Sequence, residues 1–389
     1  MTKQNEKDAK RVPELRFKGF ADAWEQRKLG DVTDIKTGSR NHQDSVENGK
    51  YPFFVRSEKI ERLDEYDFDT TAILIPGDGR IGEIFHYYDG KFALHQRVYK
   101  VDNFNGIDAL FLLSLFRYSF RRHALRLNAQ GTVPSLRLPM FTKWEILLPK
   151  LEEQEKIGQL FQSLDKTITL HEEKQRQLEQ LKKALLQKMF ADETGYPVLR
   201  FKGFTEKWEQ VKLSKTSRSY SGGTPKVGVH EYYDGQIPFI RSGEIASKST
   251  ELTISKVGLN NSSAKLVSKG DILYALYGAT SGEVSLSKIN GAINQAILAI
   301  KPIDGYENYF LMTWLQKEKE QITRTYLQGG QGNLSAKIVM NLVVNIPSLS
   351  EQSQIAQIFS KLDKTITLHD KKIQYLKQLK RGLLQKMFV

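Results

Sequence analysis

The sequence predicts a mixed α/β (α+β) fold with a pseudo-twofold internal repeat. Two variable α/β domains are each followed by a long conserved helix, and the two helices pair as an antiparallel coiled coil. Three observations predict this fold: short motifs recur in the same order in both halves of the 389-residue chain, a long helical apolar pattern closes each half, and strand-like segments fill the region between. Such self-similarity indicates a duplicated structural unit.

The motif that opens each half is repeated letter for letter. Leu15–Phe20 reads LRFKGF, and the same letters recur at Leu199–Phe204. Both copies continue into Trp-Glu-Gln, at Trp24 and Trp208, and then into Lys-Leu. These leading motifs mark the start of two equivalent halves.

A second pair of motifs closes each half. LDKTITLH occupies Leu164–His171 and recurs at Leu362–His369, and LLQKMF occupies Leu185–Phe190 and recurs at Leu383–Phe388. The interval between the two leading motifs is shorter than the interval between the closing motifs, so the enclosed region is longer in the second copy. The ends of the repeat are constant, whereas the middles diverge.

The closing motifs belong to two long amphipathic helices. From Leu151 to Phe190 apolar residues recur mostly three or four positions apart, with Glu, Gln and Lys between them, and the second copy repeats this pattern. The spacing predicts one helix in each half, roughly 50 to 60 Å long. Because so long a stripe needs a partner, we expect the two helices to pack together, antiparallel. The positions expected at the helix pair or at a partner interface are Leu164, Ile168, Leu178, Leu181 and Leu185 in the first helix and Leu362, Ile366, Leu376, Leu379 and Leu383 in the second.

The middles have the pattern of short strands followed by a helix. β-branched and aromatic residues alternate with turn signals, and a helical stretch follows in each copy. Faint matches between the copies, such as PFFVRS against PFIRS, predict one shared fold. The expected strands are Tyr51–Val55, Ala72–Ile75, Ile81–Tyr87, Phe92–Tyr99, Ile237–Arg241, Asp271–Tyr277, Gly282–Leu286 and Ala292–Ile300, with helices at Ala109–Leu127 and Glu307–Tyr326.

The repeat divides the chain into consecutive segments. A leading segment and a variable domain precede each helix. The expected bounds are 1–24 and 25–150 for the first leading segment and variable domain, 151–191 for the first helix, 192–208 and 209–348 for the second leading segment and domain, and 349–389 for the second helix.

Composition narrows the class of partner. A formal charge of +13 and a pI near 9.4 favour a polyanion, with nucleic acid ahead of an anionic membrane. The chain has no Cys, which excludes disulfides, Cys-ligated zinc and thiol catalysis and fits a reducing compartment. No run of about 18 apolar residues is present, so we expect a soluble, cytoplasmic protein without a membrane partner.

Two stretches without acidic residues lie at the same place in each copy, at 109–144 and 321–350. Basic side chains suit phosphates and guanine, and Asn and Gln suit adenine. A solvated helix face is the alternative for each stretch alone, but its recurrence in both copies favours DNA contact. The candidate contacts are Arg117, Arg121, Arg122, Arg126 and Arg137 in the first copy and Arg324, Gln328, Gln331 and Asn333 in the second.

Further DNA-binding candidates lie at strand ends and in Gly-rich loops. Buried polar residues satisfied within a sheet are an equally good interpretation of His95-Gln96 and Asn294-Gln295. A structural ion pair is an equally good interpretation of Arg56 and Arg241. The complete set is Arg40, Arg56, Arg80, His95 and Gln96 in the first copy and Thr224, Lys226, Arg241, Asn294 and Gln295 in the second.

No catalytic or metal-binding residue is expected. GDGRIG at Gly77–Gly82 matches GxGxxG, but it lies between two strand-like segments, so a hairpin turn is the better interpretation. The chain has no Walker A pattern and no Pro-Pro, and no H-x-x-x-H pair offers metal-ligand spacing. A self-contained DNA enzyme should carry such a motif.

The order of these motifs resembles the specificity subunit of Type I restriction-modification systems. The likeness rests on RFKGF…WE…KL at the leading motifs, on L…EQ…I…LDK where each helix begins, and on LLQKMF where it ends, and it covers essentially the whole chain. It implies target-recognition domains that each bind half of a split double-stranded DNA site. Only the second half has GGTPK, at Gly222–Lys226, where the first has TGSRN at Thr37–Asn41.

The resemblance also implies partners and cofactors. The conserved helices would set the unread spacer and dock modification subunits, two of them, which carry the methyltransferase, while restriction subunits carry the translocase and nuclease. S-adenosylmethionine, ATP and magnesium would belong to those partners and none to this chain, which is not an enzyme by itself. Divergent middles imply two different half-sites. A coiled-coil adaptor that binds only protein is the alternative function.

Overall fold

The computed structural model describes residues 11–128, 134–327 and 333–389. These form two compact units, one made of residues 1–173 and 370–389 and the other of residues 174–369. Each unit thus holds one leading motif, one variable domain and part of both long helices.

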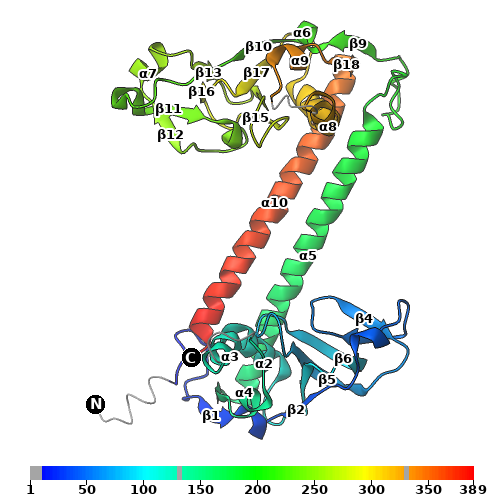
Figure 1. The fold of residues 1–389 in the computed structure, drawn as a ribbon, viewed down its shortest axis with the longest axis vertical. Helices are drawn as coiled ribbons and strands as arrows, with labels where there is room; N and C mark the ends of the chain where they lie inside the picture. Colours follow the sequence, from blue (N-terminus) through cyan, green and yellow to red (C-terminus); the bar gives the residue numbers. More distant parts are fainter. Residues whose placement is uncertain (1–10, 129–133, 328–332) are drawn as a thin grey trace. The chain divides into compact units, whose positions relative to one another are not determined.

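A six-stranded sheet forms the variable domain of the first unit (Figure 1). All neighbours in it are antiparallel except β3 and β6, which run parallel and pair Phe53 with Ala93 and Phe54 with Leu94. Its strands in spatial order are β2 (Asp34–Thr37), β7 (Val98–Asp102), β5 (Phe68–Pro76), β6 (His86–Leu94), β3 (Tyr51–Phe54) and β4 (Ile60–Leu63). A separate antiparallel pair joins β1 (Glu25–Lys28) to β8 (Glu145–Leu148).

Helices follow the sheet in the chain and supply much of the core. Asp108 caps α2, because its carboxylate accepts a hydrogen bond from Phe111 N at 2.7 Å. The expected helix 109–127 is one helical run, but it contains a π-helical turn, η3. The elements are α2 (Ala109–Leu115), η3 (Phe116–Phe120), α3 (Arg121–Arg126) and α4 (Leu138–Thr142).

The end of the chain completes the core of the first unit. Phe388 is only 3% exposed, and its ring lies 5.3 Å from Phe111, 5.9 Å from Phe161 and 6.2 Å from Trp24. In the second unit Phe190 takes the same place, 5.2 Å from Phe310 and 6.4 Å from Trp208. Each copy of the LLQKMF motif therefore closes the core of the domain other than the one immediately before its own long helix.

The second unit repeats the arrangement with its sheet divided in two. The parallel pairing recurs between β11 and β16, which join Phe239 to Ala292 and Ile240 to Ile293. One sheet is β10 (Ser217–Ser221), β17 (Ile297–Pro302), β14 (Ile272–Ala275) and β15 (Val284–Leu286), and the other is β12 (Leu252–Ile254), β11 (Tyr233–Ile240), β16 (Gly291–Ile293) and β13 (Lys265–Val267). The remaining elements are β9 (Glu209–Lys212) paired with β18 (Val343–Ile346), α6 (Leu213–Thr216), α7 (Lys256–Asn260), α8 (Asn308–Tyr326) and α9 (Ala336–Met340).

Three expected strands are wrong in their bounds. Residues 81–83 form a turn and residues 84–85 lie outside any strand, because Ile81 and Ile84 are buried in the core and Phe85 stacks on Phe116 at 5.6 Å. Residues 92–99 and 292–300 are each broken by a turn, after Leu94 and after Ile293. The expected hairpin turn at GDGRIG is confirmed, since it joins the antiparallel neighbours β5 and β6.

The long helices are α5 (Leu151–Met189) and α10 (Leu349–Met387), and they run antiparallel in each unit. Lys380 contacts Asp165 in the first unit, and Lys182 lies 2.6 Å from Asp363 in the second. These are the same two positions of the repeat, so the fold class predicted from the sequence is confirmed.

The burial of the expected interface leucines is uneven. Ile168 and Leu376 are buried and Leu164, Leu178, Leu185, Leu362, Ile366 and Leu383 are partly buried. Leu181 and Leu379, however, are 47% and 37% exposed. Their exposure leaves both leucines outside the helix pair, where the adjacent Lys182 and Lys380 contact carboxylates of the other helix, and their prediction as partner-interface positions stays a prediction.

The leading motif is held by a buried ion pair. Arg16 binds Glu153 through two hydrogen bonds of 2.8 and 2.5 Å, and Arg200 binds Glu351 through two of 2.8 Å. Both glutamates are at most 1% exposed. A buried carboxylate is costly without a partner, so the arginine of LRFKGF fastens each leading motif to the start of a long helix.

Candidate DNA interface

Loops from several strands meet at one edge of the first sheet. Arg40 N donates to Leu94 O at 3.2 Å, and Gln96 N donates to Arg40 O at 2.9 Å. Arg40 and His95 form a parallel bridge. The structure therefore brings together Arg40, His95 and Gln96, which lie far apart in the sequence.

Glycine is required where these loops approach the sheet. A Cβ on Gly38 would lie 2.0 Å from Leu94 O, and one on Gly222 would lie 1.8 Å from Ile293 O. No side chain fits at such distances. The loops TGSRN and GGTPK thus share one conformational constraint although their other residues differ.

The second unit assembles the equivalent edge. Thr224 donates a hydrogen bond of 2.6 Å to Gln295 Oε1. Asn333 forms an isolated bridge with Tyr277. Thr224, Gln295, Asn294 and Asn333 are therefore placed by neighbouring loops, whereas Gln328 and Gln331 lie outside the described residues.

Each edge contains a pocket. The first-half pocket, of about 440 Å³, is lined by Arg56, Asp78 and His95 together with His42, Val55, Ser57 and Gly79. The second-half pocket, of about 420 Å³, includes Thr224, Asp234, Arg241 and Asn294. His42, Asp78 and Asp234 were not predicted from the sequence, because nothing local marks them.

The two strand-end arginines are not equivalent in register. Because Phe54 and Ile240 occupy the same place in the parallel pairing, Arg241 corresponds to Val55, and Arg56 follows one residue later. The match of PFFVRS with PFIRS therefore needs a one-residue shift. His95 and Asn294, which follow Leu94 and Ile293, do correspond.

Carboxylates hold the predicted arginines of the two edges. Arg40 binds Asp67 at 2.8 Å and Glu65 at 3.0 Å, and hydrogen bonds to Asp67 and then Glu65 raise the pKa of Arg40. Arg56 lies 3.4 Å from Asp78. The expectation of an ion-pair partner at Arg56 is thus met, although 52% of its side chain stays exposed.

Arg241 is held still more firmly. Its guanidinium lies 3.1 Å from Glu244 and contacts Glu251, and these hydrogen bonds raise the pKa of Arg241. Arg80 and Arg121 share Glu83, each at 2.9 Å. Carboxylates thus contact each of these guanidiniums, although more than half of the Arg80 and Arg121 side chains stays exposed.

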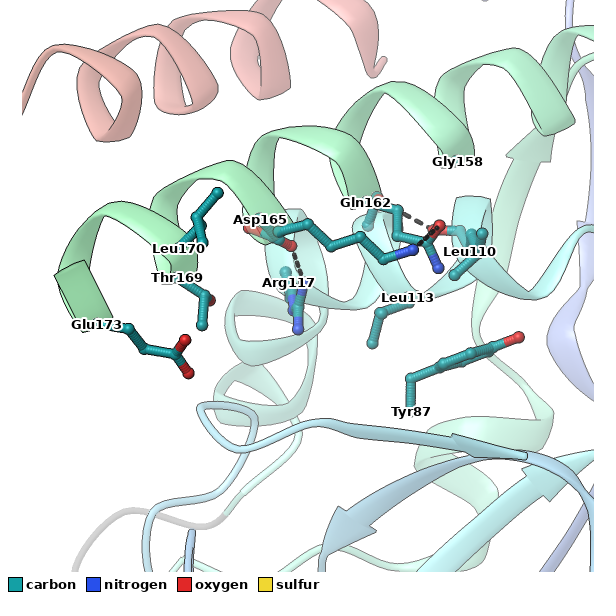
Figure 2. Close-up of a pocket in the computed structure, with 12 residues that line it drawn as sticks. Tyr87, Leu110, Leu113, Arg117, Gly158, Gln162, Asp165, Thr169, Leu170 and Glu173 are labelled. Carbon is teal, nitrogen blue, oxygen red and sulfur yellow. Dashed lines mark hydrogen bonds and ion pairs between the residues drawn. The ribbon is translucent and has the colours of Figure 1, made fainter. Parts of the chain in front are cut away.

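Arg117 lies elsewhere. Its guanidinium is 2.5 Å from Asp165 of α5, in a separate pocket of about 410 Å³ that Tyr87 and Leu113 also line (Figure 2). The structure thus separates Arg117 from the loops that hold Arg40 and His95. Asp165 also contacts Lys380, so Arg117 belongs to the helix-pair surface.

The remaining cations are surface groups. Arg122 lies over the Tyr118 ring at 5.8 Å. Among the described residues no carboxylate pairs with Arg126, Arg137, Lys226 or Arg324, and all four are exposed. Exposed cations without partners suit phosphate contacts, which need charge more than fixed geometry.

His95 and Asn294 are oriented by their own backbone. Nδ1 of His95 accepts a hydrogen bond from Arg97 N at 2.9 Å, and Oδ1 of Asn294 accepts one from Ala296 N at 3.1 Å. Burial, assisted by the charge of Arg56, lowers the pKa of His95. His95 is therefore neutral at pH 7, and its proton is on Nε2.

No helix in 11–128, 134–327 or 333–389 is long and apolar enough to cross a membrane. Nor do three or more His, Asp or Glu side chains gather there in a group that could hold a metal ion.

Comparison with known proteins gives consistent matches. The chain is 29% identical over 189 residues to the specificity subunit of the Type I restriction enzyme MjaVIII of Methanocaldococcus jannaschii, which covers 47% of this chain and 42% of that protein. It is 29% identical over 163 residues to the EcoDI specificity subunit of Escherichia coli, covering 42% and 35%. The matched stretch is thus less than half of either relative.

A solved structure and a family model extend over most of the chain. The crystal structure of the S subunit of a Type I restriction-modification system from M. genitalium has a TM-score of 0.73 at 18% identity and covers 97% of this chain and 99% of that one, so the fold is shared. The model of the Type I restriction modification DNA specificity domain matches residues 21–180 and again 182–378. The chain therefore belongs to the family of Type I restriction-modification DNA specificity proteins.

Proposed function

We propose that the chain is the DNA sequence-specificity subunit of a Type I restriction-modification complex. Each variable domain binds one half of a bipartite, asymmetric double-stranded DNA target. The observation that carries the proposal is that both units place loops and a pocket at the same edge of the same fold, but line them with different side chains. Two domains of the same fold with different side chains in their pockets are suited to bind two half-sites of different sequence.

The chain directs other subunits and performs no chemistry itself. Two modification subunits supply the methyltransferase, and restriction subunits supply the translocase and nuclease. S-adenosylmethionine, ATP and magnesium act in those partners, in the cytoplasm. Leucines at equivalent positions of the two long helices are exposed: Leu170 is 64% exposed and Leu368 66%, and Leu181 and Leu379 are exposed as well. Two equivalent apolar surfaces support the binding of two copies of one partner.

Genome-wide methylation tests the proposal. The chain is co-expressed with its modification subunit, and methyladenine is mapped by sequencing, with the chain omitted as the control. We expect one bipartite motif that depends on the chain. Replacing Ser39–Pro149 with another recognition domain should change one half of the motif and leave the other half intact.

The result also separates the proposal from a protein-only adaptor. An adaptor would leave the methylated motif unchanged when a variable domain is exchanged. Methylation that is absent with the chain, or present without it, would refute the proposal. A helix insertion in α5 and α10 should alter only the unread spacer between the two halves of the motif.

A further inference from the structure

We propose that Asp67 is a positioning residue for recognition of the first half-site. Its carboxylate ties the loop TGSRN to the end of β6, and Arg40, whose guanidinium it binds, holds that loop instead of contacting DNA. The inference rests on the proposed function and deepens it, because it names a residue on which recognition of one half-site depends although that residue does not touch DNA.

Three hydrogen bonds join Arg40, Leu94 and Asp67 in a closed ring. Arg40 N donates to Leu94 O at 3.2 Å. Leu94 N donates to Asp67 Oδ2 at 3.0 Å, and Arg40 Nε donates to Asp67 Oδ1 at 2.8 Å. One oxygen of the carboxylate therefore binds the loop and the other binds the strand.

The strand pairing explains why a carboxylate is placed here. The ladder between β5 and β6 ends at the pair Phe68 and Phe92, and Asp67 N still donates to Phe92 O at 2.9 Å. Leu94 lies beyond that pair and is fully buried, so its N–H needs a partner other than β5. The Asp67 side chain supplies that partner at the point where the ladder stops.

Both ends of the ring lead to walls of the first-half pocket. His95 follows Leu94 directly, and His42 follows the loop TGSRN directly, and both histidines line the pocket. Asp67 is not one of the described residues that line it, and its side chain is only 14% exposed. Asp67 therefore acts on the pocket through the residues that it holds.

Arg40 is poorly suited to a phosphate contact. Its Nε binds Asp67 at 2.8 Å, and its Nη2 lies 3.0 Å from Glu65. One guanidinium and two carboxylates together carry one net negative charge, which repels a phosphate. The exposed Arg126, with which no described carboxylate pairs, suits the DNA backbone better.

The second half ties the equivalent loop by different chemistry. Thr224 lies two residues after Gly222, as Arg40 lies two residues after Gly38, and the two glycines make the same close approach to the sheet. The Thr224 hydroxyl donates to Gln295 Oε1 at 2.6 Å, so a neutral hydrogen bond replaces the ion pair. Two diverged domains thus keep a side-chain bond from this loop position, which supports a role for that bond in recognition.

The test is a binding profile of the full chain in complex with its modification subunits, in which each base pair of the mapped target is varied in turn. Asp67→Asn keeps an acceptor for Leu94 N but loses the ion pair with Arg40. Gln96 still holds the loop through Asn41 at 2.5 Å, so the loop is loosened while the domain stays folded. Discrimination at more than one position of the first half-site should fall by about 5-fold to 15-fold, the loss expected of a partly exposed hydrogen bond to a charged group. The second half-site should keep its profile.

Arg40→Met separates holding the loop from contacting DNA. A lost phosphate contact would reduce the slope of log affinity against log salt by about 0.9 and leave base discrimination intact. A lost base contact would alter a single position. We expect instead an unchanged slope and the same altered positions as in Asp67→Asn. The double variant should lose no more than the larger single loss, because both changes remove one interaction.

A matched control is available in the second domain. Asp271 lies 2.9 Å from Lys301, is 15% exposed and also accepts a backbone N–H, from Ser268 at 2.8 Å. It precedes β14, whereas the edge that holds the second-half pocket follows the other end of that strand. Asp271→Asn should leave both half-site profiles unchanged. Thermal unfolding of each complex establishes that it is folded.

The second half offers an independent test. Thr224→Val removes the hydroxyl that Gln295 accepts and keeps a similar shape, so it should reduce discrimination at the second half-site alone. Thr224→Ser keeps the hydroxyl and should retain that discrimination.

The outcomes are separable. An unchanged profile in Asp67→Asn, a reduced salt slope or a single altered position in Arg40→Met, or additive losses in the double variant would overturn this inference and leave the proposed function standing. A profile altered as much by Asp271→Asn as by Asp67→Asn would overturn it as well. A wild-type complex that discriminates no base would overturn both.

Discussion

Removing the aromatic ring near the end of the chain should unfold the domain at its beginning. Phe388 contributes to the core of the first unit, where Tyr118 at 5.5 Å completes a cage with Trp24, Phe111 and Phe161. Phe388→Ala removes a ring that is only 3% exposed and leaves a cavity. Such a change in a packed core costs about 3 to 5 kcal/mol.

The cost can be expressed as a shift in melting temperature. For units of about 150 to 250 residues, 1 kcal/mol corresponds to roughly 2 to 4 °C. Phe388→Ala should therefore lower the unfolding temperature of the first unit by about 6 to 20 °C. Calorimetry of the full chain measures the shift, and hydrogen exchange locates it.

Two matched variants complete the experiment. Phe190→Ala should transfer the same loss to the second unit, because Phe190 occupies the equivalent position there. Tyr375→Ala removes an aromatic ring from α10 that is 58% exposed, and it should change stability by less than about 0.5 kcal/mol. If Phe388→Ala lowered stability no more than Tyr375→Ala, or unfolded the second unit first, the inference that Phe388 completes the core of the first unit would be refuted.

Three further changes have expected outcomes. Glu153→Gln removes the buried negative charge that pairs with Arg16 and should cost about 3 to 5 kcal/mol in urea denaturation, and a loss below about 1 kcal/mol would contradict a buried ion pair. Burial lowers the pKa of His123, so the unfolded chain binds its proton more readily. The stability that neutral His123 contributes is present above about pH 6.5 and is lost as the pH falls toward the lower pKa of the folded state. His123→Phe should therefore make the free energy of unfolding less dependent on pH in that range. Gly222→Ala places a Cβ 1.8 Å from Ile293 O, and it should weaken binding at the second half-site alone, which a half-site competition assay detects.

Sequence periodicity predicted the long helices better than the strands. The helix expected from Leu151 to Phe190 ends one residue earlier in the structure. The expected strand 81–87 failed because Phe85 packs on Phe116 instead of pairing along a ladder. A short apolar stretch has the same sequence pattern whether it packs in the core or pairs as a strand. A helical pattern sustained over 39 residues indicates only a helix.

The sequence named candidate DNA-binding residues but did not show how they assemble. Arg40, His95 and Gln96 were named from the sequence, and the structure brings them to one edge. Arg117, named with them, is directed instead to Asp165. The carboxylate partners could not be predicted, because salt bridges between residues distant in the chain depend on how the loops fold back.

What the sequence by itself determined is the duplication: two leading motifs, two divergent domains and two long helices, and through them the family. Those features are repeated locally, so they are visible without a fold. Only the tertiary structure decided that Phe388 completes the first core, that Lys182 and Lys380 contact carboxylates of the partner helix, and that backbone N–H groups hold Nδ1 of His95 and Oδ1 of Asn294. Those outcomes depend on side-chain direction and on contacts between distant residues, and no pattern along the chain encodes either of them alone.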